Sequence, residues 1–406
     1  MPCPPDRPFC ELVATLATVL DMEDEYKLYH AWRVALIARE LARHLLPAEE
    51  ALVFYGGLLH DLGGIGLPDH LVHQVLRPGA EQDPEIREHP RRGAAMVRVM
   101  PALGERVARM VEEHHERWDG SGYPKGLRGQ EISPGALLIN IADVFDLQLR
   151  AAPGATWEKV RRSMAPLAGR AYPGEVWQGF DRLMSGTLWD NLVAEVALER
   201  AIEAAMQELP PVEFSPDQTL KAAIALFAQI IDAKHGYTGG HSQRVAVYAV
   251  KLAQCLGLEE AEREKVEVAG LLHDFGKVAV PRPVLDKAGP LSQEEWQVVK
   301  RHPGRTIALL SQVSGLKEVA ELAGLHHERY DGRGYPYGLR GGEIPLAARI
   351  IAVADAYDAM TSPRPYQLTR TPAQALEMLQ KAAGTQFDPE VVAVAPVLVD
   401  PEGRCP

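Results

Sequence analysis

Histidine and aspartate residues that could bind metal ions recur along the second half of this chain. Two adjacent pairs, His273-Asp274 and His326-His327, are accompanied by the single residues His241, His302 and Asp355. Neutral imidazoles and carboxylates suit first-row metals such as iron, manganese or zinc, and a carboxylate can bridge two ions through its two oxygens. These residue types therefore predict a polynuclear metal site.

The residues can be divided into two ligand sets that share Asp274. The first set is His241, His273, Asp274 and Asp355, and the second is Asp274, His302, His326 and His327. Two neighbouring ions would activate a bridging water and stabilise the phosphoryl oxygens of an in-line displacement. The ligand sets therefore predict phosphoester hydrolysis.

The same order of residue types occurs once more in the first half of the chain. The matching residues are His30, His60, Asp61, His89, His114, His115 and Asp143. A lone inward-facing histidine is more often a hydrogen-bonded core residue than a ligand. An ordered set repeated across a whole domain favours ligands instead, so the chain carries two candidate metal sites.

Composition limits the classes of partner. The chain has 406 residues, of which 46% are hydrophobic and 24% charged, and this suggests two well-cored domains. A net charge of -12 disfavours nonspecific binding to nucleic acid polymers or anionic membranes. The N-terminus has no apolar signal core, and no apolar run reaches the roughly 18 residues needed to span a bilayer. We expect a cytoplasmic protein without a membrane segment.

Apolar residues repeat with helical spacing. After His241, the residues Val245, Tyr248, Leu252 and Leu256 recur three or four positions apart, so the histidine points inward with them. Few segments have strand patterns, and we therefore predict an all-α protein of two tandem helical domains. We place them at residues 1–180 and 212–406, joined by a connecting helix and linker at 181–211.

Glycines and cysteines give two further expectations. Gly63 and Gly276 follow the two His-Asp pairs and are expected to end the helices that carry them. The four cysteines, Cys3, Cys10, Cys255 and Cys405, show no CxxC spacing. Reduced thiols are therefore expected, rather than a disulfide framework or a zinc site.

Three segments carry a family resemblance. Residues 271–277 around His273-Asp274, the Gly-Tyr-Pro segment 334–336 and residues 350–359 around Asp355 resemble the HD-GYP family of bacterial cyclic di-GMP phosphodiesterases, a branch of the HD metal-dependent phosphohydrolases. The match covers about 215–392 closely and about 9–177 more loosely. It implies tandem HD-type helical domains, with a di-iron or di-manganese centre in the second that hydrolyses a cyclic dinucleotide to the linear form or to mononucleotides.

The resemblance also implies roles for individual residues. Asp274 and Lys277 match catalytic positions, and Lys277 also matches a lysine that contacts a substrate phosphate. Arg364 matches a position that holds the other phosphate, a contact that suits the forked guanidinium. Tyr335 of the Gly-Tyr-Pro segment is expected to bind substrate at the entrance of the site.

Departures from the family pattern limit these expectations. Tyr237 and Tyr26 stand where some members carry a glutamate that binds a third metal, so two metals and accumulation of the linear dinucleotide are expected. In the first domain Gly64 replaces Lys277 and Ala152 replaces Arg364. A second metal centre there would belong either to a regulatory or packing domain or to a weak second hydrolase.

Cyclic di-GMP is the leading substrate, and cyclic GMP-AMP is its nearest rival because tandem domains with a degenerate first copy also resemble enzymes for that molecule. A general nucleotide phosphohydrolase would leave the Gly-Tyr-Pro segment unexplained. A nonhydrolytic cyclic-dinucleotide receptor is a third alternative, disfavoured by Lys277 and the intact second ligand set. A second copy of the chain and signalling proteins are the candidate protein partners.

Overall fold

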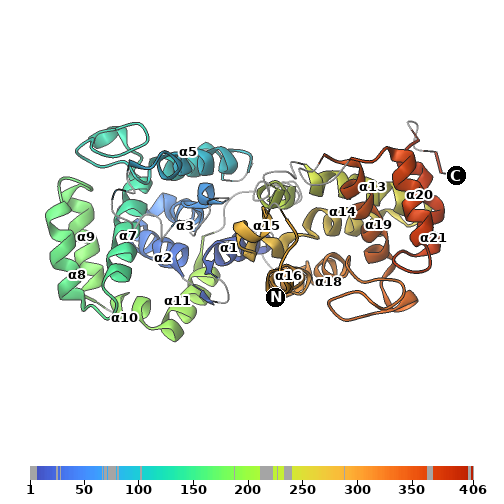
Figure 1. The fold of residues 1–406 in the computed structure, drawn as a ribbon. Helices are drawn as coiled ribbons and strands as arrows, with labels where there is room; N and C mark the ends of the chain where they lie inside the picture. The colour runs from blue at the N-terminus through green and yellow to red at the C-terminus, as the bar shows by residue number, and fades with distance from the viewer. Residues whose placement is uncertain are drawn as a thin grey trace. The chain divides into compact units, whose positions relative to one another are not determined.

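The computed structural model describes residues 7–23, 26–27, 29–65, 67, 71, 79, 82–100, 103–186, 188–210, 223–225, 227–232, 240–287, 289–363, 369–400 and 404–405. The chain divides into two compact units, Met1–Ala222 and Ala223–Pro406. Helices dominate both units (Figure 1), which confirms the predicted all-α class. The described strands are a two-residue antiparallel pair, β1 (Met22–Glu23) and β2 (Tyr26–Lys27).

The first unit is built around α2, which packs against α3 and α7. Its helices are α1 (Arg7–Leu20), α2 (His30–Leu45), α3 (Glu50–Leu59), α5 (Pro84–Arg98), α6 (Gly104–Glu113), α7 (Pro134–Ala151), α8 (Trp157–Met164), α9 (Gly174–Met184), α10 (Leu188–Val193) and α11 (Glu195–Glu208). The segment predicted as a connector carries α10 and α11, and Glu199 of α11 accepts a hydrogen bond from Tyr29 at 2.6 Å. The predicted boundaries at 180 and 211 remain predictions.

The second unit repeats this arrangement, with α13 packed against α14 and α19. Its helices are α13 (His241–Cys255), α14 (Glu260–Leu272), α15 (Arg282–Leu285), α16 (Gln293–Lys300), α17 (His302–Leu310), α18 (Lys317–Gly324), α19 (Leu346–Thr361), α20 (Pro372–Ala382) and α21 (Pro389–Val394). Val245 and Leu252 of the predicted apolar stripe are fully buried. Burial of this stripe turns His241, the first residue of α13, toward the interior of the unit.

Gly276 does not end a helix as expected. Helix α14 ends at Leu272, before the His-Asp pair, and Gly276 lies in the 3-10 turn η6 (Phe275–Ala279). A Cβ atom on Gly276 would overlap the backbone oxygen of His302. Glycine is therefore required so that α17 can approach this turn closely. Gly63 has the same role in the first unit, where a Cβ would overlap the backbone of α5.

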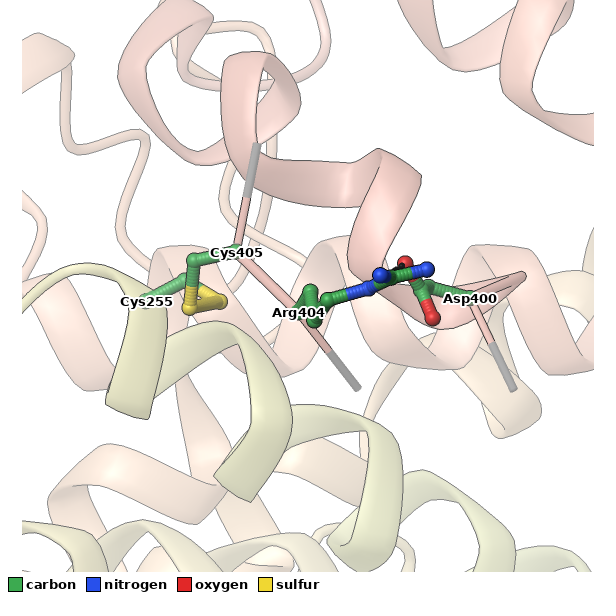
Figure 2. The surroundings of a disulfide bond; sticks show 4 residues. All are labelled: Cys255, Asp400, Arg404 and Cys405. Atoms are coloured by element: carbon green, nitrogen blue, oxygen red, sulfur yellow. Dashed lines mark ion pairs between the residues drawn. A yellow bond between two sulfur atoms is a disulfide. The ribbon is translucent and has the colours of Figure 1, made fainter. Parts of the chain in front are cut away.

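The expectation of reduced thiols is wrong for one pair of cysteines. Cys255, the last residue of α13, forms a disulfide with Cys405 (Figure 2). The two residues are 150 positions apart and meet because the C-terminal segment returns to the end of α13. Spacing along the sequence does not contain that information. Cys10 is buried, with its Sγ 3.5 Å from Met206 Sδ, and Cys3 lies outside the described residues.

Among the helices in the described part of the chain, none is both long and apolar enough to cross a membrane.

Candidate metal centres

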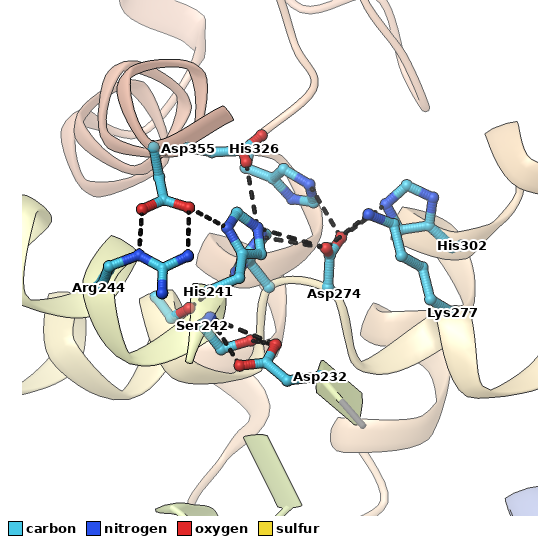
Figure 3. A network of polar contacts seen from close by, with 12 residues as sticks. Asp232, His241, Ser242, Arg244, Asp274, Lys277, His302, His326 and Asp355 are labelled. Atoms are coloured by element: carbon cyan, nitrogen blue, oxygen red, sulfur yellow. Dashed lines mark hydrogen bonds and ion pairs between the residues drawn. The ribbon is translucent and has the colours of Figure 1, made fainter. Parts of the chain in front are cut away.

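Asp274 lies between two groups of histidines in the second unit (Figure 3). Its Oδ2 is 3.4 Å from His273 Nε2 and 3.8 Å from His241 Nε2. Its Oδ1 is 3.3 Å from His302 Nε2 and 3.8 Å from His326 Nε2. Each carboxylate oxygen thus faces a different group, which is the arrangement a carboxylate shared by two cations requires.

The remaining predicted ligands complete the two groups. Asp355 Oδ1 lies 3.4 Å from His241 Nε2, and His327 joins the other group. Within each of three groups, the candidate ligand atoms all lie within 4.8 Å of one another. The first group is His241, His273 and Asp355, and the second is His302, His326 and His327. The third, His273, Asp274 and His326, connects the other two. The structure therefore brings together every second-unit residue predicted as a metal ligand. That each one binds an ion remains a prediction.

Helix ends deliver the histidines and Asp274 to one place, whereas Asp355 lies inside α19. His241 and His302 begin α13 and α17, whereas the two adjacent pairs follow the ends of α14 and α18. Asp232 holds the first turn of α13, because its carboxylate accepts hydrogen bonds from the Ser242 backbone N–H at 3.1 Å and hydroxyl at 2.8 Å (Figure 3). This contact fixes the start of the helix that carries His241.

Backbone hydrogen bonds determine which nitrogen of each histidine faces the cluster. The Nδ1 atoms of His273, His302 and His326 lie 2.8, 2.6 and 2.6 Å from the carbonyl oxygens of Gly270, Val299 and Ala323. A carbonyl only accepts, so each Nδ1 carries the hydrogen and each Nε2 presents a lone pair.

These lone pairs have no partner within the described residues. The Nε2 atoms of His273, His302 and His326, together with Asp274 Oδ1, are buried and make no hydrogen bond there. A buried polar atom without a partner costs about 1–3 kcal/mol. A divalent cation in each group would satisfy all four atoms, so the residues fit the metal centre that the sequence predicts.

The protonation states of His326, His327 and Asp274 also suit metal ligands. Burial holds the pKa of His326 well below its ordinary value and lowers that of His327 to about 3, so both rings are neutral at physiological pH. Burial opposes ionisation of Asp274, but the positive charge of Lys277 and the contacts with histidines outweigh it and hold the pKa of Asp274 well below its ordinary value. Neutral imidazoles and ionised carboxylates are the forms that bind metals.

The first unit has the same geometry around Asp61. Its Oδ2 is 3.3 Å from His30 Nε2 and 3.4 Å from His60 Nε2. Its Oδ1 is 3.3 Å from His89 Nε2 and 3.8 Å from His114 Nε2. His115 and Asp143 complete the two groups. All of the predicted first-unit ligands are therefore brought together as well.

Two nitrogens in the first unit face each other in an arrangement that favours a cation between them. The Nε2 atoms of His89 and His114 are 3.2 Å apart. Each ring places its Nδ1 2.6 Å from a backbone carbonyl, that of Ile86 or Val111, so both Nε2 atoms are acceptors. Two acceptors at this distance repel each other, and a bound cation would relieve the repulsion.

Comparison with known proteins identifies the family. A family profile described as "HD domain" matches residues 14–172 and 225–391. The chain belongs to the HD domain family. It is 30% identical over 445 residues to the 3'3'-cGAMP-specific phosphodiesterase 3 of Vibrio cholerae, covering 95% of this chain and 93% of that one.

A second curated relative and a solved structure are also cyclic-dinucleotide phosphodiesterases by name. The chain is 41% identical over 199 residues to the cyclic di-GMP phosphodiesterase response regulator RpfG of Xanthomonas campestris, covering 48% of this chain and 51% of that one. The crystal structure of a cyclic GMP-AMP specific phosphodiesterase of V. cholerae, V-cGAP3, superposes with a TM-score of 0.65 at 27% identity, covering 97% of this chain and 98% of that one. The resemblance inferred from the motifs is confirmed.

The structure describes Lys277 and Tyr335, but not Arg364, of the substrate-contact residues predicted for the second HD domain. Lys277 lies at the cluster, with its Nζ 2.5 Å from Asp274 Oδ2 (Figure 3). Tyr335 packs on the ring of His327 with centroids 4.9 Å apart, and the ammonium of Lys300 lies 5.2 Å from the Tyr335 ring centroid. Arg364 lies outside the described residues, as do Tyr237 and the side chain of Tyr26. The phosphate contacts themselves remain predictions.

A residue that our sequence interpretation missed orients His241. Asp358 Oδ2 lies 2.7 Å from His241 Nδ1, and Arg244 donates to the same carboxylate through Nε at 2.6 Å and through Nη2 at 3.1 Å. Burial raises the pKa of Asp358, but these two partners outweigh it and lower the pKa. An ionised Asp358 therefore holds the ring so that Nε2 faces Asp274.

The sequence does contain a signal for this role. The spacing of Asp355 and Asp358 recurs in the first HD domain as Asp143 and Asp146. Asp146 Oδ2 lies 2.7 Å from His30 Nδ1, and so repeats the contact.

A buried glutamate holds the Gly-Tyr-Pro loop beside the second cluster. Glu328 follows His327 directly, and its carboxylate accepts backbone N–H bonds from Tyr337, Gly338 and Leu339 at 2.6, 3.0 and 3.0 Å. These bonds close the loop that carries Tyr335. Glu116 makes the equivalent bonds in the first HD domain. The repeated His-His-Glu order could have revealed this role.

The two HD domains differ at the position of Lys277. Gly64 takes its place in the first domain, and a Cβ there would lie 2.9 Å from Leu71 Cδ2. Leu71 is buried with Leu67 and Ile86 in a small apolar cluster. The space beside Gly64 is therefore filled by an apolar side chain, and the position supplies no positive charge.

A cavity of about 500 Å³ adjoins the metal-ligand cluster of the second HD domain. His326, His327 and Asp355 line one part of it, next to Tyr335. Residues of α16, α19 and α20 and of the loop after α20 line further parts. The volume lies in the range of ordinary small-molecule sites, so a ligand of nucleotide size can reach the cluster.

Proposed function

We propose that this protein is a metal-dependent phosphodiesterase that hydrolyses a cyclic dinucleotide in its second HD domain. The observation that carries the proposal is the position of Asp274, whose two oxygens face the buried Nε2 atoms of His273 and His302, neither of which has a hydrogen-bond partner among the described residues. The product is the linear dinucleotide, pGpG if the substrate is cyclic di-GMP, with further hydrolysis to GMP as a slower step.

The metal centre would consist of two divalent ions, iron or manganese. Its ligands would be His241, His273, Asp274, His302, His326, His327 and Asp355. Bound there, the ions would activate a water molecule and stabilise charge on the phosphoryl oxygens.

Residues beside the centre would position the substrate. Lys277 places a positive charge next to Asp274, where it would bind one phosphate of the substrate. Arg364 is proposed to hold the second phosphate. Tyr335, packed on His327 at the cavity wall, would confine the ligand.

Cyclic di-GMP is the substrate that the motifs favour, and cyclic GMP-AMP is the second candidate. The second candidate is supported by the relative named as 3'3'-cGAMP-specific, which matches this chain over nearly its whole length. The relative named for cyclic di-GMP matches about half of the chain. A general nucleotide phosphohydrolase and a nonhydrolytic receptor receive no such support.

The first HD domain is proposed to hold a second metal centre. Its ligands would be His30, His60, Asp61, His89, His114, His115 and Asp143. Because Gly64 supplies no charge there, we propose metal binding without efficient hydrolysis. A regulatory or packing role and weak hydrolysis both remain candidate roles. The cytoplasmic location, a homodimer and signalling partner proteins likewise remain predictions.

The test is an assay of anaerobically purified protein supplied with iron or manganese and a panel of cyclic dinucleotides. Products are identified by chromatography and bound metal by elemental analysis. Asp274→Asn should abolish hydrolysis, because an amide nitrogen cannot replace the shared carboxylate oxygen. Asp61→Asn is the matched control in the first domain and should retain most of the activity.

Absence of any linear product from the wild-type protein would refute the proposed function. Full activity of Asp274→Asn, or loss of most activity in a folded Asp61→Asn variant, would refute the assignment of catalysis to the second domain.

A further inference from the structure

The cavity of the second HD domain extends beyond the proposed metal centre to a wall that carries no metal-ligand residues. This wall is formed by Met360 of α19, Met378 and Ala382 of α20, and Gln386 and Phe387 of the loop after α20. Trp296 of α16 lines another part of the same cavity. Asp355 of α19 lines the same cavity, which therefore reaches from the proposed metal centre to this wall.

The wall offers apolar surface that is not covered by the described residues. Met378 is 40% exposed and Met360 is half-buried. A methionine side chain is flexible and polarisable, and it packs well against the face of an aromatic ring. A base that lay against these side chains would remove apolar surface from water, which stabilises the bound state.

Gln386 supplies one polar group at this wall. Its backbone is fixed, since its N–H donates to Ala382 O at 3.0 Å and its oxygen accepts from Tyr330 N–H at 3.1 Å. Its side chain is exposed, and in the part of the chain that the structure describes the carboxamide has no hydrogen-bond partner. An anchored residue with an unoccupied carboxamide is suited to bind the edge of a base.

The first HD domain provides an internal comparison. Ala171 is the counterpart of Gln386, because its oxygen accepts from Trp118 N–H at 3.0 Å as that of Gln386 accepts from Tyr330. By the same register, Ser163 stands in place of Met378. The register that aligns Asp143 with Asp355 places Gln148 opposite Met360. The domain that lacks the counterpart of Lys277 therefore also lacks the methionines and the glutamine of this wall.

We propose that Met360, Met378 and Gln386 form a purine-binding subsite, in which the Gln386 carboxamide hydrogen-bonds the edge of one base of the substrate. The proposal rests on the proposed function, because a phosphate held at the metal-ligand cluster places the attached nucleoside in the rest of the cavity. A carboxamide both donates and accepts, so it pairs with adenine or with guanine. A carboxylate only accepts, so it would favour the N–H groups of guanine.

The first test compares substrates with and without bases. Gln386→Ala should lower kcat/KM for cyclic di-GMP and cyclic GMP-AMP by about tenfold relative to bis(p-nitrophenyl) phosphate, a diester without bases, because a two-bond contact with a base edge is lost. Gln380→Ala is the matched control. It removes an exposed glutamine of α20, the helix before Gln386, that does not line the cavity, and the ratio should not change.

The second test exchanges hydrogen-bonding character at the same position. In Gln386→Glu, the inhibition constant of cyclic di-AMP against bis(p-nitrophenyl) phosphate hydrolysis should rise about tenfold more than that of cyclic di-GMP. An unchanged ratio in Gln386→Ala, or equal shifts for the two inhibitors in Gln386→Glu, would overturn the subsite while hydrolysis stands. A wild-type protein that cleaves the base-free diester but no cyclic dinucleotide would overturn the proposed function and the subsite together.

Discussion

Replacing Asp358 with asparagine should weaken metal binding in the second HD domain by about 10- to 100-fold, the range typical for loss of a group that orients a ligating histidine. This corresponds to about 1.4–2.8 kcal/mol of binding free energy. The substitution preserves the size of the side chain and does not alter any proposed ligand. A change in metal affinity would therefore report on the orientation of His241.

The expected effect follows from the groups around the Asp358 carboxylate, which all donate hydrogen bonds. Oδ2 accepts from His241 Nδ1 at 2.7 Å, and Oδ1 accepts from Arg244 Nε at 2.6 Å and from the Ser362 hydroxyl at 3.1 Å. An asparagine amide must turn its NH2 group toward one of these donors in either orientation. His241 then loses its fixed orientation, or Arg244 loses part of its pairing and repels the amide.

The assay is a manganese titration of the metal-stripped full-length protein, with thermal melts to verify folding. Asp358→Asn should weaken sites in the second domain only. Asp146→Asn, the matched variant, should weaken sites in the first domain only, because Asp146 contacts His30 in the same way. If a folded Asp358→Asn variant bound the same number of ions with unchanged affinity, other contacts would have to position His241 and our reasoning would be wrong.

Three further outcomes are expected. Lys277→Ala should lower turnover by about 100-fold, because a positive charge near the substrate is lost. The metal content should not change, because Lys277 is not a metal ligand. Wild-type turnover in this variant would exclude Lys277 from the mechanism. Glu328→Gln should lower the free energy of unfolding by about 1–3 kcal/mol, measured by denaturant titration, because the buried carboxylate accepts three backbone N–H bonds. Unchanged stability would contradict this loop contact. In time-resolved chromatography the linear dinucleotide should accumulate before mononucleotide, because a two-metal centre must rebind the product for a second cut. Early mononucleotide without a linear intermediate would contradict our interpretation that Tyr237, in place of a glutamate ligand, leaves the centre without a third metal.

The sequence was sufficient to identify the ligand-type residues because they repeat. Every histidine and aspartate predicted for the two sites lies in one of the two clusters, since residue type and spacing on helices place such side chains on inward faces. The all-α class followed from the same periodicity. The repeated Asp355–Asp358 and His-His-Glu spacings are also present in the sequence, and they are a signal for the supporting roles of Asp358 and Glu328.

Tertiary structure decided how those residues are used. Only the approach of α17 to the turn at Gly276 places His302 at one oxygen of Asp274 while His273 faces the other. The pairing of Cys255 with Cys405 likewise depends on the path of the chain over 150 residues. Local spacing determines which side chains share a helix face, but contacts between distant segments depend on how whole helices pack, and a sequence pattern read segment by segment does not encode that packing.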